Sequence, residues 1–218
     1  MTEKLEIYDM DGNLLRVQDR DEYYESIREE FKKNGKITTQ VKAIRMLLMN
    51  ERGMLYIQKR SPLKAENPGL YDKTVGGHVK AGHTWDLTVV QECHEELGFP
   101  AVVLTDEEFK LAVRATDLSI IGLFRKVDLI EKFISIRKRG NEHIKQPYIT
   151  AIYVGYYDGG IRFKDGEATG IEVLSLEDLQ NRIKKNPKDF TEDLKFMIKK
   201  FKKYLIPAPR EVEETHAY

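Results

Sequence analysis

The feature that most constrains this chain is a segment rich in glycine and glutamate at residues 76–99. It contains the run GGHVKAGH and, eight residues further on, the run ECHEELGF. Apolar periodicity predicts a helix over residues 85–97. At 100° per residue, Glu92, Glu95 and Glu96 then lie within an arc of about 100° on one helix face. The segment therefore gathers three carboxylates between glycines.

Three carboxylates at this spacing favour a divalent metal site. Like charges three and four residues apart repel and raise one another's pKa, and a hard cation such as Mg²⁺ or Mn²⁺ removes that conflict. The alternative is a solvated acidic helix face. However, six glycines and glutamates at fixed spacing arise by chance in roughly one chain in ten thousand, at about 8% for each residue type. Gly76 and Gly77 also permit close backbone approach, and Gly98 is expected to end the helix in a left-handed conformation.

The remaining chain alternates short strands and helices, which predicts a mixed α/β (α+β) fold. A hairpin at 5–17 and a helix at 21–33 come first. Further strands are expected at 41–49, 54–58, 71–75, 118–127, 132–138 and 148–157, and further helices at 106–115, 176–185 and 190–204. Glu142 and His143 fall in a charged connection.

Charge and cysteine content exclude several classes of protein. The 36 basic and 36 acidic residues give zero formal net charge, so the chain lacks the basic field of a dedicated nucleic-acid binder. One cysteine excludes a disulfide framework and a multi-cysteine zinc site. The charged N-terminus predicts no secretory signal, and no apolar run is long enough for a membrane span. We expect a reduced, cytoplasmic protein.

Gly77, Glu92, Glu95 and Glu96 stand at the spacing of the Nudix box, which this segment resembles. The resemblance implies the Nudix fold, a mixed β-sheet sandwiched between helices. It implies hydrolysis of a diphosphate linked to another group, often a nucleoside. It also implies that Glu92, Glu95, Glu96 and the backbone carbonyl of Gly76 bind the divalent metal.

Two positions depart from the Nudix pattern. His83 stands where the family usually has glutamate, and Gln91 stands where it usually has arginine. These two positions tend to interact in the family, and a histidine and a glutamine can still form a neutral hydrogen bond. The departures bear on the catalytic rate and on the orientation of Glu92, and not on the fold.

Upstream residues extend the resemblance to isopentenyl-diphosphate isomerases and their hydrolase-like relatives. Arg60, Lys64 and His78 lie at the spacings seen there. The resemblance implies that Arg60 and Lys64 bind the substrate diphosphate, which suits a bidentate guanidinium and a point charge. Their alternative is a pair of ordinary surface charges on a polar loop. For His78 the resemblance implies metal binding, and the alternative is a hydrogen-bonded strand histidine.

Isomerase activity itself is not expected. Isomerases need a cysteine where this chain has Gly76, and a Glu-x-Glu motif late in the sheet that residues 144–150 lack. They also use N-terminal histidines for metal, whereas no histidine precedes His78. Cys93 cannot substitute, because it lies on the packed side of its helix. The chain thus combines an isomerase-like frame with hydrolase-like metal ligands.

A further acidic candidate is Glu167, in a loop before the C-terminal helices. Many Nudix hydrolases place an additional acidic residue there, as a metal ligand or as the base on the attacking water. The alternative is that Asp-Gly-Glu forms only a turn. We divide the chain into an N-terminal hairpin and helix addition at 1–37, a Nudix hydrolase domain at 38–205 and a flexible C-terminal tail at 206–218, mobile or docked on a neighbour.

The expected function is divalent-metal-dependent hydrolysis of a phosphoanhydride bond in a small nucleoside or other diphosphate. Glu92, Glu96 and Glu167 are the expected catalytic residues, with Mg²⁺ or Mn²⁺ as cofactor. The alternatives are a non-catalytic Nudix-fold sensor of a nucleotide or diphosphate and, third, a diphosphate isomerase. The expected partners are the small diphosphate substrate and, by family analogy, a second copy of the chain. Neither a membrane nor nucleic acid is an expected partner, although RNA cap hydrolysis would need only a local basic groove.

Overall fold

The structure is a computed structural model that describes residues 3–140, 142–162 and 168–210. Its elements are β1 (Lys4–Asp9), β2 (Leu14–Asp19), α1 (Arg20–Asn34), β3 (Thr39–Met49), β4 (Leu55–Arg60), β5 (Tyr71–Asp72), α2 (Trp85–Glu92), a π-helical turn (Cys93–Leu97), β6 (Ala101–Val103), α3 (Asp106–Ala115), β7 (Gly122–Arg139), β8 (Glu142–Tyr156), β9 (Ala168–Leu174), α4 (Leu176–Lys185) and α5 (Glu192–Lys200), with short 3₁₀ turns at Pro187–Asp189 and Lys202–Tyr204. Within these ranges no helix is long and apolar enough to cross a membrane.

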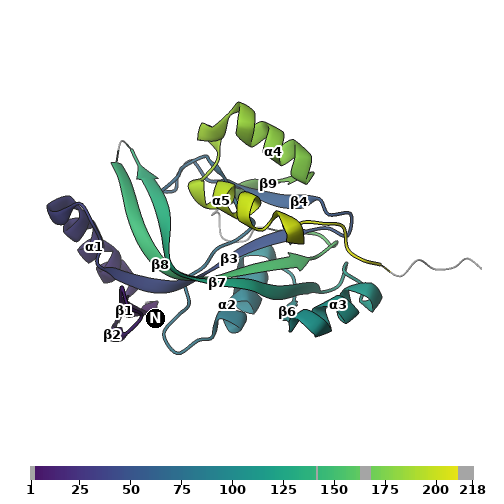
Figure 1. The fold of residues 1–218 in the computed structure, drawn as a ribbon, viewed down its shortest axis with the longest axis horizontal. Coiled ribbons are helices and arrows are strands. Elements are labelled where there is room, and N and C mark those ends of the chain that lie inside the picture. Colours follow the sequence, from purple (N-terminus) through teal and green to yellow (C-terminus); the bar gives the residue numbers. More distant parts are fainter. Residues whose placement is uncertain (1–2, 141, 163–167, 211–218) are drawn as a thin grey trace, which may run out of the picture.

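The strands form one mixed sheet, in which the order β2-β1-β3-β8-β7-β6 makes the main path (Figure 1). β4 branches from β3 and pairs with β5 and β9. β3 runs parallel to β8, from the pair Val41 and Tyr148 to the pair Met49 and Tyr156. β7 and β8 form a long antiparallel hairpin that rises beyond the body of the sheet in Figure 1.

Alternation along β3 divides its side chains between two helical layers. Leu47 and Met49 belong to the apolar cluster that contains Met197 of α5. Ile44 and Met46 belong to the cluster that contains the α2 side, with Val89, Cys93 and Leu97. Figure 1 shows α4 and α5 above the sheet and α2 below it. The predicted mixed sheet sandwiched between helices is confirmed.

The predicted N-terminal hairpin and helix are also present. β1 pairs antiparallel with β2 and with β3, so the hairpin extends the main sheet. Asp19 caps α1 by accepting a hydrogen bond from the backbone N–H of Asp21, and Gly35 ends the helix at φ 68°. Tyr23 and Ile27 are buried in a third apolar cluster with residues of β1, β3, β7 and β8. The division of the chain at residues 37 and 205 stays a prediction.

Several expected strand boundaries are wrong. The two strands expected at 118–127 and 132–138 are one strand, β7, whose register shifts between Lys126 and Asp128 and between Ile130 and Phe133. These irregularities interrupt the alternation that marks a strand in the sequence. β8 begins at Glu142 rather than at residue 148, so Glu142 and His143 lie in a strand and not in a connection.

Two short strands were not expected. β6 pairs in parallel with β7 over its three residues, and β9 pairs antiparallel with β4. Ile171 and Val173 do alternate with polar residues in β9, so a weak signal was present. Of the expected tail, residues 206–210 lie against the body of the protein: the backbone N–H of Ala208 donates to the carbonyl of Glu51, and Arg210 forms an ion pair with Glu51.

Candidate active site

A cavity of about 500 Å³ lies between the glycine–glutamate segment, α1, the loop after β4 and the β7–β8 hairpin. It brings together every expected site residue that the structure describes, namely Gly76, Glu92, Glu95, Glu96, Arg60 and Lys64, and it also takes in His78. Glu167 lies outside the described residues. The lining combines these glutamates with arginine and lysine side chains and with further carboxylates, among them Glu66, Asp72 and Asp193.

The glycine pair is held against β3. The backbone N–H groups of Ile44 and Met46 donate to the carbonyls of Gly77 and Val75, at 2.8 and 2.9 Å. In an antiparallel register, the carbonyl of the intervening Gly76 then points away from β3. The Gly76 carbonyl, which is the expected metal ligand, therefore accepts no hydrogen bond from β3.

Gly77 leaves room for the carboxyl group of Glu92. A Cβ atom added at this position would lie 2.5 Å from Cδ of Glu92. Any side chain larger than hydrogen would displace the Glu92 carboxyl group. The close approach of Glu92 thus requires a glycine at position 77. The sequence predicted a close approach of backbone at this glycine pair, but not the residue that makes it.

The helix that carries the glutamates ends differently from the expectation. α2 stops at Glu92, and Cys93–Leu97 form a π-helical turn closed by Gly98 in the left-handed conformation, at φ 78°. The left-handed end is confirmed, whereas a regular α-helix to residue 97 is wrong. Such π turns are rare and are frequently found at functional sites. Cys93 and Leu97 are fully buried, which confirms the packed side of the helix.

Burial and mutual repulsion dominate the electrostatics of the glutamates. Burial raises the pKa of Glu92, the charge of Glu95 adds to that rise, and a hydrogen bond from Glu96 opposes it. Glu92 and Glu96 therefore share a hydrogen bond where two full charges would repel. Among the described residues, no three side chains of His, Cys, Asp or Glu already converge to hold a metal ion.

The donor set nevertheless fits a hard divalent cation. It consists of three carboxylates and the backbone carbonyl of Gly76, all from residues that line the cavity, and oxygen donors are what Mg²⁺ and Mn²⁺ prefer. Gly77, which leaves space for Glu92, lines the same cavity. The residues present are thus chemically suited to a divalent ion. A bound ion would replace the hydrogen bond that Glu92 and Glu96 share in its absence.

The two residues that depart from the Nudix pattern contact each other. His83 Nδ1 lies 3.2 Å from Oε1 of Gln91, within hydrogen-bond distance. This contact spans the loop before α2 and the turn of α2 that precedes Glu92. The pairing that the family usually makes with opposite charges is made here by a histidine and an amide.

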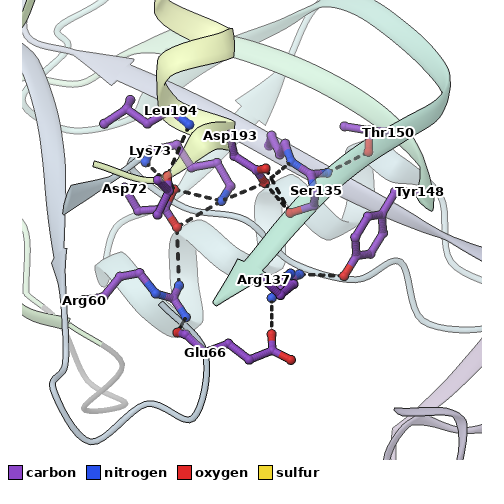
Figure 2. A network of polar contacts seen from close by, with 12 residues as sticks. Arg60, Glu66, Asp72, Lys73, Ser135, Arg137, Tyr148, Thr150, Asp193 and Leu194 are labelled. Atoms are coloured by element: carbon purple, nitrogen blue, oxygen red, sulfur yellow. Dashed lines mark hydrogen bonds and ion pairs between the residues drawn. The ribbon is translucent and has the colours of Figure 1, made fainter. Parts of the chain in front are cut away.

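Arg60 lies beside the cavity in a set of ion pairs (Figure 2). Its Nη1 is 3.4 Å from Asp72, and its Nη2 donates to the backbone carbonyl of Glu66 at 2.9 Å. The Glu66 carboxylate pairs in turn with Arg137 at 2.7 Å. Lys64 lies on the connecting loop. Arg60 and Lys64 thus line the same cavity, and their binding of a diphosphate stays a prediction.

A buried cluster that sequence reasoning missed supports this wall. Arg45 of β3 pairs with Asp193 of α5 at 2.9 Å, and Ser135 donates to the same carboxylate at 2.9 Å. Lys73 lies 3.2 Å from Asp72. Burial alone would raise the pKa of Asp193, but the charges of Arg45 and Lys73 hold it below its ordinary value. Figure 2 shows Asp193 between Lys73 and Ser135 in this cluster.

His78 is tied to the N-terminal helix. Its Nε2 lies 2.6 Å from the hydroxyl of Tyr24, which also lies 3.0 Å from the hydroxyl of Tyr148. Burial and the nearby arginines hold the pKa of His78 well below its ordinary value, so the ring is neutral. These contacts agree with the alternative interpretation of His78 as a hydrogen-bonded histidine, because its Nε2 atom already has a hydrogen-bond partner.

Comparison with known proteins gives matches over most of the chain. A family model described as NUDIX domain matches residues 39–194. The isopentenyl-diphosphate Delta-isomerase of Salmonella heidelberg (strain SL476) is 36% identical over 70 residues. That match takes in 32% of this chain and 39% of the isomerase, so it spans less than half the length of the relative.

Two solved structures illustrate the structural similarity. The crystal structure of DR0079 from Deinococcus radiodurans has a TM-score of 0.60 at 20% identity, over 90% of this chain and 98% of that one. A bifunctional NMN adenylyltransferase/ADP ribose pyrophosphatase from Francisella tularensis, complexed with AMP and a Mn ion, has a TM-score of 0.50 at 15% identity, over 85% of this chain and 47% of that one. At these identities the likeness concerns the fold.

Proposed function

We propose, from the premise that the chain belongs to the Nudix family, that it hydrolyses a phosphoanhydride bond in a nucleoside diphosphate derivative or a related diphosphate. The observation that carries the proposal is one cavity whose lining includes both the three glutamates and the cationic Arg60 and Lys64. A diphosphate presents anionic oxygens to the arginine and lysine while its scissile bond lies toward the glutamates. The name of the Francisella relative points to the same class of substrate.

The roles of the residues follow from their chemistry. Glu92, Glu95, Glu96 and the Gly76 carbonyl would hold Mg²⁺ or Mn²⁺. When bound, such an ion neutralises charge on phosphate oxygens and lowers the pKa of water. Arg60 and Lys64 orient the diphosphate through charge-assisted hydrogen bonds. Glu92 orients the attacking water or accepts its proton, and Glu167 is the second candidate for that base.

A non-catalytic sensor is the second candidate function. It is favoured by the His83–Gln91 pair, which stands in place of the family's charged pair beside Glu92. A sensor would bind a diphosphate with metal and release no product. Isomerase activity is not proposed, because Gly76 occupies the position of the required cysteine. Assembly into a homodimer stays a prediction that light scattering in solution tests.

The deciding experiment measures phosphate and pyrophosphate release from nucleoside diphosphate derivatives, isoprenoid diphosphates and thiamine diphosphate, with Mg²⁺ and with Mn²⁺. We expect turnover of at least one substrate and a loss of at least about 100-fold in Glu96→Gln, the size of effect expected when a group acting in the transition state is removed. Glu107→Gln, an exposed glutamate in the first turn of α3, is the matched control and should keep full activity. Full turnover by Glu96→Gln would overturn the assignment. No product from any substrate, together with metal-dependent binding of one of them, would favour the sensor.

A further inference from the structure

One face of α1 forms a wall of the cavity. Arg20, Tyr24 and Arg28 recur every four residues, so they lie within an arc of about 80° on the helix, and all three line the cavity. Tyr23 and Ile27, on the adjoining arc, are buried against the sheet. The packing of these two apolar side chains therefore fixes the rotation that turns the Arg20–Tyr24–Arg28 stripe toward the site.

Tyr24 ties the middle of the stripe to the glycine–glutamate segment. Its hydroxyl lies 2.6 Å from His78, the residue after Gly77, and 3.0 Å from Tyr148 of β8. Gln146 of β8 donates to the same hydroxyl at 3.2 Å. Figure 1 shows α1 running alongside the β7–β8 hairpin. The middle of the stripe is thus held between the glycine–glutamate segment and the β7–β8 hairpin.

The two arginines of the stripe differ in their partners. Arg20 is paired with Glu3 at 3.3 Å and with Asp21 at 3.5 Å. Arg28 lies one helical turn beyond Tyr24, about 6 Å further along the axis. It lines the cavity without a carboxylate partner in the part of the chain that the structure describes. The cavity lining therefore includes a positive charge that no carboxylate of the described residues neutralises.

The β7–β8 hairpin contributes a second such charge. Arg139 lines the same cavity, and it too has no carboxylate partner among residues 3–140, 142–162 and 168–210. Arg137, two residues earlier on the same strand face, is paired with Glu66 and also donates to the hydroxyl of Tyr148 at 2.6 Å. Among the arginines that line the cavity, Arg28 and Arg139 are therefore the two without a carboxylate partner in the described residues, so their charges are available to a ligand.

We propose that Arg28 and Arg139 bind a phosphate group of the substrate that is separate from the scissile diphosphate. The proposal rests on the proposed function, since it places the diphosphate between the glutamates and Arg60. Two guanidinium groups match the charge and the oxygen geometry of a phosphate monoester dianion better than those of a hydroxyl group. The substrate class is then a nucleoside diphosphate derivative that carries an additional monoester phosphate.

A binding measurement tests this independently of turnover. The ligands are adenosine 2′,5′-bisphosphate, adenosine 3′,5′-bisphosphate and AMP, which differ only in the additional phosphate and its position. Calorimetry with Mg²⁺ should give a Kd at least about tenfold lower for one bisphosphate than for AMP, in line with one extra charge-assisted contact. The two bisphosphates identify which ribose position is recognised.

Matched variants locate the effect on α1. Arg28→Ala should raise the Kd of the preferred bisphosphate about tenfold, while leaving that of AMP unchanged, and Arg28→Lys should retain part of the preference. Lys33→Ala is the control, because it removes one cation from the same helix at an exposed position, about 140° around the axis from Arg28. This control should bind all three ligands as the unmodified protein does.

The possible results separate this inference from the proposed function. Equal Kd values for the bisphosphates and AMP, or an equal loss for all ligands in Arg28→Ala, would overturn the phosphate subsite. Hydrolysis of the diphosphate panel is a separate measurement, so turnover without a preference for the bisphosphates would refute the subsite alone. Absence of turnover alongside a clear preference would refute the hydrolase and keep the subsite.

Discussion

Substitution of Gly77 by alanine should disable the site while leaving the fold intact. The new Cβ would lie 2.5 Å from Cδ of Glu92, whereas ordinary contacts begin at 3.4 Å. The carboxyl group must therefore move by about 1 Å, and a displacement of that size costs about 100-fold in rate. That loss corresponds to about 2.7 kcal/mol of transition-state stabilisation. The fold should survive, because the atoms that must move are the end of a flexible side chain.

The assay compares Gly77→Ala with Gly160→Ala, a glycine with nothing within 4 Å of the added Cβ. We expect kcat/KM on the best substrate of the panel to fall about 100-fold in the first variant and not in the second. Mn²⁺ binding, followed by electron paramagnetic resonance, should weaken in Gly77→Ala alone, and the two unfolding temperatures should agree. If Gly77→Ala kept its rate within about threefold of the control and bound Mn²⁺ equally well, the close approach of Gly77 and Glu92 would not matter for the site.

Two further measurements test the electrostatics. Asp193→Ala should lower the free energy of unfolding by about 3–5 kcal/mol in urea denaturation, because it leaves the buried Arg45 without its carboxylate partner. The control is Lys110→Ala, which removes an exposed pair with Asp106 and should lower the free energy of unfolding by less than about 0.5 kcal/mol. Equal losses in the two variants would contradict the role of the buried pair. The pKa of Glu92 is raised to about 7 in the metal-free protein, so a proton competes with the metal below that pH. Mn²⁺ affinity should therefore rise about tenfold per pH unit below pH 7 and level off above it, whereas a flat profile from pH 5 to 8 would show that Glu92 is not a ligand.

The sequence predicts the parts of the site that depend on local spacing. Glu92, Glu95 and Glu96 lie within five residues of one helical segment, so their gathering follows from local spacing, although the π-helical turn changes their exact angular positions. Gly98 ends that segment in the left-handed conformation for the same local reason. The π-helical turn was missed, because it depends on how Cys93 and Leu97 pack against the sheet and not on the identity of successive residues.

Contacts between distant segments could not be predicted in the same way. Arg45 and Asp193 are far apart in the chain, and only the parallel pairing of β3 with β8 and the packing of α5 bring them together. A partial signal did exist: Arg45 interrupts an apolar strand, and a charge buried in a sheet requires a partner of opposite charge. The sequence could thus predict that Arg45 has a partner, but not which carboxylate it is.

The N-terminal hairpin and helix show the limit of reading a chain segment by segment. Residues 1–37 precede the glycine–glutamate segment and carry no recognisable motif, so the sequence suggests only an N-terminal addition to the Nudix domain. In the structure β1 extends the main sheet, which places α1 against the cavity and brings Tyr24 within 2.6 Å of His78. Only that placement turns the four-residue spacing of Arg20, Tyr24 and Arg28 into a set of side chains that line the cavity. In the proposed function, the glutamates, which are positioned by local geometry, act on the scissile bond, and α1, which is positioned by sheet topology, contacts the group attached to it.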